Sequence, residues 1–277
     1  MRAGGARSPC TFRFEYYDVT RLLHDVTRLL PVFVAVFTLE LHSGDAFAQS
    51  RPRIWDVVLG SPIGELPLEE FVDPACGTNG GPPSLPLEGF KDFNRCPVEQ
   101  ETGLREVWFI YDDEREYIAR AERDETLIGR YSANNFYSQP IITSLFIDNM
   151  GLVQGYRVIT DPRAPAEVRI EAYLLSIVFK GMRSMLGHSS WVCTKLPRGK
   201  RERPIENVFI KESCKSVTDE RLLQLEIRHM HKPGQDIRVN PRLLSVAEGE
   251  FESSTRLEVY NIDAVRGAPC CPASVFP

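Results

Sequence analysis

Three histidines lie where they could do chemistry: the pair His229 and His231, and His188 beside two serines. His229 and His231 are two residues apart in a stretch that predicts a strand, so both rings would face the same side. That spacing can hold a zinc ion if a third ligand comes from elsewhere in the fold. A surface pair on the exposed side of an edge strand explains the same spacing, and we favour this interpretation. We therefore expect no metal site.

His188 precedes Ser189 and Ser190, a combination that a hydrolase could use. A nucleophilic serine needs a base within hydrogen-bond distance, and adjacency in sequence does not provide that geometry. The sequence has no Gly-x-Ser-x-Gly motif, no phosphate-binding glycine loop with its lysine, and no Cys-x-x-Cys pair. We therefore predict no catalytic residues and no cofactor.

Four of the seven cysteines form two pairs with similar spacing. Cys76 and Cys96 flank a loop rich in glycine and proline, and Cys193 and Cys214 flank a basic segment. Neither loop has the apolar periodicity needed to order itself. We predict a local disulfide for each pair, and closing a loop of about 20 residues would stabilise the fold by about 3 kcal/mol.

The segment inside the second pair is basic although the chain as a whole is acidic. Lys and Arg total 33 against 38 Asp and Glu, a net charge of −5, so bulk positive charge for nucleic-acid binding is absent. The segment could contact another envelope protein or an anionic surface. A solvated hairpin tip is the alternative. Its basic residues are Lys195, Arg198, Lys200, Arg201 and Arg203.

Residues 1–48 predict a signal peptide. Leu29–Leu39 carries no charge and is shorter than the roughly 20 apolar residues that cross a bilayer. The triplet Ala46-Phe47-Ala48 has the small-x-small form that signal peptidase accepts, which places cleavage before Gln49. A start codon downstream of Met1 and an uncleaved signal anchor are the alternatives.

Cleavage at this position would also remove Cys10 and leave an even number of cysteines. An even number suits an exported, oxidised protein. We therefore expect a periplasmic or secreted location, and a chain that is not an integral membrane protein after cleavage.

Strand patterns dominate the rest of the chain. Leu104–Tyr111 predicts a central strand, in which Val107, Phe109 and Tyr111 alternate with Glu106, Trp108 and Ile110. Ile147–Gly151 joins two β-rich runs, Pro140–Phe146 and Leu152–Thr160, into a predicted hairpin. Strands that follow one another without intervening helices favour an α+β fold with antiparallel sheet. Further strands are expected at 207–210, 222–230, 243–246 and 254–262.

Two helices are expected beside these strands. Apolar residues at spacings of three and four predict one long helix at about 166–186, before Gly187. Ser61 and Pro62 predict the start of a short N-terminal helix at about 61–71. These elements suggest an N-terminal α+β unit at 49–163, a C-terminal α+β unit at 164–265, and a flexible tail at 266–277 containing Cys270 and Cys271.

The sequence therefore predicts an exported, non-enzymatic envelope or periplasmic protein that acts as a binding or assembly module. The order of a short helix before antiparallel strands is similar to that of small periplasmic α+β binding modules, a likeness of fold that implies no site. The alternative is a secreted hydrolase using His188, or a metal-dependent enzyme using His229 and His231.

Overall fold

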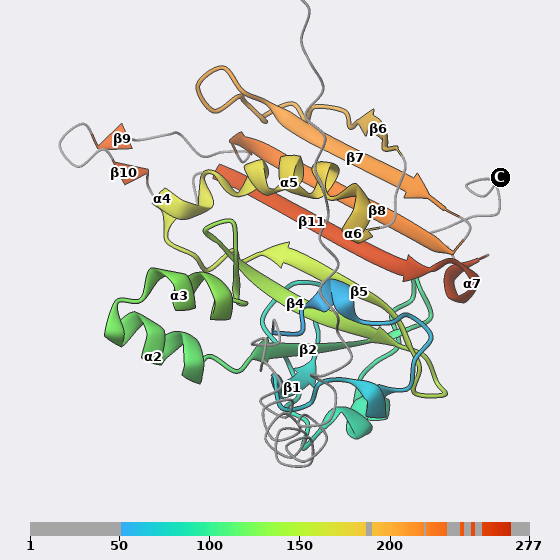
Figure 1. Cartoon of the computed structure of the whole chain (residues 1–277). Helices are drawn as coiled ribbons and strands as arrows, with labels where there is room; N and C mark the ends of the chain where they lie inside the picture. Colours follow the sequence, from blue (N-terminus) through green and yellow to red (C-terminus); the bar gives the residue numbers. More distant parts are fainter. Residues whose placement is uncertain are drawn as a thin grey trace, which may run out of the picture. The chain divides into compact units, whose positions relative to one another are not determined.

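The computed structural model of this 277-residue chain describes residues 51–186, 190–218, 220–231, 239–240, 245–246 and 251–266 (Figure 1). All of these belong to one compact unit, Ser50–Pro277. The predicted signal peptide, its cleavage point before Gln49, and the tail from residue 267 onward lie outside the described residues. Among the described residues, no helix combines the length and apolar character needed to cross a bilayer.

A nine-stranded antiparallel sheet forms the centre of this unit (Figure 1). Its main path runs β1-β2-β4-β5-β11-β8-β7-β6, and the short β3 pairs with β4. The two remaining strands, β9 and β10, pair with each other. The bounds are β1 Phe71–Cys76, β2 Arg105–Tyr111, β3 Asn135–Phe136, β4 Gln139–Ile147, β5 Val153–Thr160, β6 Val192–Lys195, β7 Ile210–Val217, β8 Arg221–His231, β9 Val239–Asn240, β10 Ser245–Val246 and β11 Phe251–Asn261.

The predicted strands near the centre of the sheet are confirmed. β2 covers the strand expected at 104–111, and its alternating Val107, Phe109 and Tyr111 are buried in the core. β4 and β5 form the expected hairpin, with Leu145 opposite Tyr156. The chain is thus broadly α+β, with a large antiparallel sheet and few helices.

The helices are short. The bounds of the α-helices are α2 Glu114–Glu122, α3 Glu125–Tyr131, α4 Ala166–Arg169, α5 Leu175–Gly181, α6 Arg183–Leu186 and α7 Ile262–Val265. The 3-10 helices are η3 Ile54–Asp56, η4 Ile63–Glu65, η5 Phe90–Arg95 and η6 Ala172–Leu174. α5 and η6 pack on β11 (Figure 1).

The prediction of one long helix at 166–186 is wrong, because the segment is broken into α4, η6, α5 and α6. Two hydroxyls of β11 hold the break between α4 and η6. Ser253 Oγ donates to Ile170 O at 2.8 Å, and Thr255 Oγ1 donates to Ala172 O at 2.8 Å. Contacts with the sheet therefore replace the hydrogen bonds that a continuous helix would make, while the apolar spacing still buries Leu175 and Phe179.

The short helix predicted at 61–71 is also wrong. Only the single turn η4 forms there, and Phe71 is already the first residue of β1. The Phe71 ring stacks on Phe109 at a centroid distance of 4.2 Å and meets Tyr111 edge-on at 5.2 Å. This aromatic packing favours the extended strand over the end of a helix.

The sheet buries both of its faces near β5. One face carries Tyr156 and Val158 into the main core, which also contains Phe179 of α5. The opposite face carries Arg157 and is covered by parts of the loop region between β1 and β2. The sheet crosses the boundary predicted between 163 and 164, because β5 pairs with β11 along residues 155–159 and 256–260.

Candidate functional site

Both predicted cysteine pairs are disulfides in the structure. Cys76 and Cys96 are joined with their Cα atoms 5.2 Å apart, and Cys193 and Cys214 with their Cα atoms 3.9 Å apart. The second bond links directly opposed residues of the paired strands β6 and β7. Each bond is local, as the spacing predicts.

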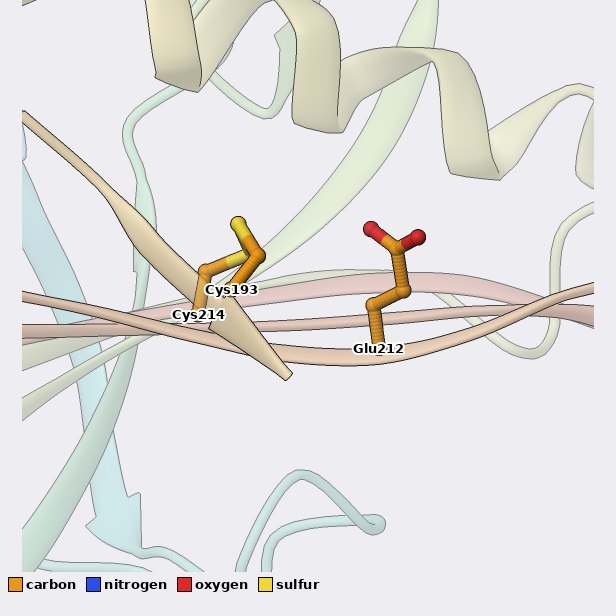
Figure 2. A group of neighbouring side chains, drawn as sticks. All are labelled: Cys193, Glu212 and Cys214. Carbon is orange, nitrogen blue, oxygen red and sulfur yellow. A yellow bond between two sulfur atoms is a disulfide. The ribbon is translucent and has the colours of Figure 1, made fainter. Parts of the chain in front are cut away.

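The Cys193–Cys214 disulfide lies beside a carboxylate. Figure 2 shows the disulfide and the Glu212 side chain on the same face of β7, with their potential ligand atoms within 4.8 Å of one another. Among the described residues this is the only group of three potential metal ligands. Its two sulfur atoms are bonded to each other and are not thiolates, and Glu212 lies 3.7 Å from Lys180 Nζ. The disulfide is thus a covalent link between β6 and β7, with Glu212 beside it.

The histidine pair does not lie on an exposed edge, so that interpretation is wrong. β8 lies between β11 and β7, and His229 and His231 are 4% and 7% exposed. His229 Nδ1 is 3.2 Å from Ser253 Oγ, and its ring packs against Tyr173 at 4.2 Å. Burial, followed by the neighbouring His231, lowers the pKa of His229 to about 4. A neutral imidazole packed in this way is part of the contact between β8, β11 and η6.

His188 and Ser189 of the possible hydrolase lie outside the described residues. Ser190 is described and exposed.

All five predicted basic residues of the 195–203 segment are exposed: Lys195, Arg198, Lys200, Arg201 and Arg203. The segment is held partly by its own acid, Glu202, which accepts hydrogen bonds from Gly199 N at 2.7 Å and Lys211 Nζ at 2.8 Å. The hydrogen bond from Lys211 is the main reason that the pKa of Glu202 lies below its usual value. Arg198 Nε donates to Glu202 O at 2.7 Å. The 195–203 segment therefore has an exposed positive surface, and the negative charge of Glu202 offsets part of it.

A cavity of about 570 Å³ lies elsewhere, and the sequence analysis did not find it. Its walls come from η3 and the residues just before it, from the ends of α2 and α3, and from β3 and the turn that follows. Ile54 and Ile141 are buried lining residues, whereas Arg53, Gly129 and Tyr137 are exposed lining residues. A volume of this size is in the range of small-molecule sites.

Local contacts hold the far wall of this cavity. The Asp124 carboxylate caps α3 by accepting from Thr126 N and Leu127 N, both at 3.0 Å. The Asn134 side chain fastens the next segment to β2, because its Oδ1 accepts from Tyr111 N at 3.1 Å and its Nδ2 donates to Tyr111 O at 3.2 Å. The wall is therefore anchored to the central sheet.

The turn between β3 and β4 completes the rim. Tyr137 and Ser138 both have positive φ, 48° and 62°, although neither is glycine. Two-residue hairpin turns of this form strongly prefer Asn and Gly, so the backbone here is strained. The turn places Tyr137, with 70% of its surface exposed, at the edge of the cavity.

Arginines and aromatic rings line the interior. Arg51, Arg53 and Arg120 are lining residues, and among the described residues no Asp or Glu lines the cavity. Arg51 is 6% exposed, and its Nε donates to Glu70 at 2.5 Å while its Nη1 donates to Tyr131 O at 2.6 Å. Two buried donors, Arg51 Nη2 and Trp55 Nε1, have no hydrogen-bond partner among the described residues.

No protein family, no curated protein and no solved structure matches the chain. Function is therefore inferred from the geometry of the described residues together with the sequence patterns.

One signal in the sequence could have indicated the cavity. Arg51 and Arg53 lie within four residues of Trp55, a concentration of guanidinium and aromatic groups just after the predicted cleavage point. The contribution of β3 and its turn had no such signal, because Tyr137 and Ser138 are not typical turn residues.

A second buried arginine belongs to the fold and not to the cavity. Arg157 of β5 is 3% exposed and meets three carboxylates: Glu258 at 2.7 Å, Glu106 at 2.7 Å and Glu99 at 3.1 Å. Burial alone would lower the pKa of Arg157, but the three carboxylates together raise it above its usual value. Its guanidinium also lies over the Phe146 ring, 4.5 Å from the centroid.

This cluster ties the first disulfide loop to the sheet. Glu99 follows Cys96 closely in sequence, and Asn79, inside the loop, donates from its backbone N to Glu106 at 2.7 Å. Asn79 also accepts from Arg256, which in turn pairs with Glu258. The Cys76–Cys96 bond therefore closes a loop whose polar groups are already paired with β2, β5 and β11.

Proposed function

We propose that the chain is an exported, non-enzymatic binding module of the envelope or periplasm, and that its ligand occupies the cavity beside η3, α3 and β3. The observation that carries this proposal is the pair of buried donors, Arg51 Nη2 and Trp55 Nε1, in the wall of a cavity of about 570 Å³. A buried donor without a partner costs free energy, which a ligand acceptor would recover.

The disulfides support export. Two disulfides in one chain are typical of an oxidising compartment and rare in the cytosol. The predicted signal peptide at 1–48 leads to the same compartment.

The test uses a neutral fluorescent probe and one glycine. Gly129 lines the cavity, and a Cβ added there meets no atom within 4 Å. We expect N-phenyl-1-naphthylamine to bind the purified protein and Gly129→Phe to weaken this binding by about tenfold or more, because the new ring occupies the cavity. Isothermal titration and probe fluorescence would measure both affinities.

Gly181→Phe is the matched control. Gly181 lies in a helix, does not line the cavity, and also has open space where a Cβ would stand. Equal probe affinity in the two variants would contradict the proposal. Failure of the unmodified protein to bind either this probe or its sulfonated analogue, 8-anilinonaphthalene-1-sulfonate, would contradict it as well.

The exposed basic segment supports a second contact, with another envelope protein or an anionic surface. Its five basic side chains all face solvent, and the compensating Glu202 reduces their net charge. Vesicles containing phosphatidylglycerol, compared with phosphatidylcholine alone, provide the test. Reversal of Lys200 and Arg201 to Glu should abolish any difference, and no difference in the unmodified protein would reject this contact.

A further inference from the structure

The charge balance of the cavity is opposite to that of the whole chain. The chain has a net charge of −5, yet three arginines and no carboxylate are found among the described residues that line the cavity. Two of these arginines have acidic partners that are not lining residues: Glu70 for Arg51 and Glu116 for Arg120. Arg53 is exposed and lies over the Trp55 ring, 5.8 Å from the centroid. Among the described residues, the cavity lining thus includes three arginines, while the carboxylates that pair with two of them lie outside the lining.

Arg51 is held in a fixed position, and one of its nitrogens is buried without a partner among the described residues. Glu70 and Tyr131 O engage its Nε and Nη1, so the guanidinium cannot rotate freely, and Tyr111 lies 5.6 Å from it. Its Nη2 and the Trp55 Nε1 are both buried N–H donors without partners among the described residues. A guanidinium nitrogen and an indole nitrogen can donate but cannot accept. The group that would satisfy them must be an acceptor, and an anionic acceptor forms the stronger bond with a guanidinium.

The remaining wall favours a flat apolar body. The Trp55 and Phe136 rings are 4.7 Å apart, and Tyr137 meets Phe136 edge-on at 5.0 Å. Ile54, Ile128 and Ile141 add aliphatic surface. Rings in these arrangements attract another aromatic ring by stacking or edge contacts.

We propose that the cavity binds a small organic anion with an aromatic body, whose charged group accepts from Arg51 and Trp55. This inference rests on the proposed binding function and specifies its ligand class. Carboxylates, sulfonates and phosphates share the required chemistry: a negative charge, acceptor oxygens and no need for a metal.

Two probes that differ by one charged group test the inference. 8-Anilinonaphthalene-1-sulfonate has the aromatic body of N-phenyl-1-naphthylamine with a sulfonate added. We expect the sulfonate to bind the intact protein about tenfold more tightly than the neutral probe, because only the anion can accept from both buried donors. Competition by 1-naphthoate but not by 1-naphthylmethylammonium would extend the result from sulfonates to carboxylates.

Trp55→Phe removes the indole donor and retains an aromatic ring. It should weaken binding of the sulfonate by about threefold to tenfold and leave the neutral probe within about twofold of its original affinity. Arg51→Gln should weaken the sulfonate further. Trp108→Phe is the matched control, because Trp108 lies on β2 and does not line the cavity. If Arg51→Gln fails to fold, Trp55→Phe still decides the question.

The outcomes separate the two proposals. If the neutral probe binds and Gly129→Phe blocks it, but the sulfonate binds no more tightly and Trp55→Phe weakens both probes equally, the anion inference is overturned and the binding function stands. If neither probe binds the intact protein, the binding function fails as well.

Discussion

Arg157 and Arg51 are both buried arginines, and their surroundings differ in one respect. Each guanidinium nitrogen of Arg157 lies within 3.2 Å of a carboxylate oxygen, supplied by Glu99, Glu106 and Glu258. Arg51 has one carboxylate and one carbonyl as partners, and its Nη2 has no partner among the described residues. Every guanidinium nitrogen of Arg157 thus has a carboxylate partner, whereas Arg51, a residue of the cavity lining, has one nitrogen without a partner among the described residues.

This difference separates a structural ion cluster from a candidate binding site. In the Arg157 cluster, burial alone would raise the pKa of Glu258, but Arg157 and Arg256 outweigh it and hold that pKa below the usual value. Burial raises the pKa of Glu99 despite the opposing charge of Arg157, with Glu106 adding to the increase. The charges of these groups are already paired within the cluster. Unpaired donors are the more informative signal of a ligand.

The largest effect is expected from Arg157→Met, which leaves three buried carboxylates without their shared cation. Removing one partner from a buried ion cluster costs about 3–5 kcal/mol in the free energy of unfolding. Urea denaturation would measure the loss. Arg163→Met is the control, since Arg163 pairs with Asp161 at the surface and should change stability by less than about 1 kcal/mol. A loss as small as the control's would show that the cluster is not essential to the fold.

A pH titration distinguishes the cluster from the histidine contact. The folded-state pKa of His229 is about 4, below its unfolded value of 6.5, so the unfolded chain binds the proton first. Stability should therefore fall as the pH drops from about 6.5 to about 4, by about 3 kcal/mol at most. Glu258, whose pKa is lowered, contributes stability that is lost only at still more acidic pH, below its unfolded value of 4.5.

The readout is the free energy of unfolding at several pH values. His229→Asn should flatten the curve between pH 6.5 and 4 and leave the more acidic part unchanged. A variant with the same slope as the unmodified protein would assign the dependence to another group.

Arg51→Met should cost less stability than Arg157→Met, about 1–2 kcal/mol. Glu70 is partly exposed, with Arg115 Nη1 at 3.9 Å, so its carboxylate keeps other partners when Arg51 is removed. The substitution also removes the unpaired Nη2. Thermal unfolding without 8-anilinonaphthalene-1-sulfonate would show the small loss of stability. Thermal unfolding with it would show that the ligand no longer stabilises the variant. A cost equal to that of Arg157→Met would remove the distinction between the two arginines.

The smallest expected effect is an increase in the free energy of unfolding. Gly129 lies inside α3 and has open space where a Cβ would stand, so Gly129→Ala should stabilise the fold by about 0.5–1 kcal/mol. Gly155→Ala provides the opposite case, because its Cβ would lie 2.5 Å from Val259 O in the neighbouring strand. Thermal unfolding of both variants tests whether packing requires the glycine in α3. If packing does not require it, the glycine is explained by the space it leaves in the cavity. Destabilisation by Gly129→Ala would argue against that.

Sequence reasoning succeeded where the determining contacts are local. The β4–β5 hairpin and the two disulfides follow from short spacings, and the alternation in β2 follows from a pleated strand with one buried face. The break at 170–173 depends on hydroxyls of Ser253 and Thr255, which lie about 80 residues later, so helical periodicity alone could not reveal it. The spacing of His229 and His231 predicted that both rings share one face of their strand. Their burial could not be predicted in the same way, because it depends on β11 and β7 pairing on either side of β8.

The candidate site was less predictable than the fold. Its unpaired donors come from residues 51–55, its far wall from α3, and its rim from an unusual turn at Tyr137 and Ser138. No periodicity connects these segments. They meet because Asn134 fastens its segment to Tyr111, a side-chain contact between residues 23 positions apart.

The place of β11 in the sheet has a consequence for how the protein is made. Among the described residues β11 is the last strand along the chain, yet it lies between β5 and β8. During synthesis, the ribosome releases β1 to β5 well before residues 251–261, so the edge of β5 that pairs with β11 stays unpaired while residues 161–250 emerge. A premature stop codon before β11 would therefore remove the strand that joins the two halves of the sheet, and a shortened product would become a target for proteases and chaperones rather than a smaller working protein.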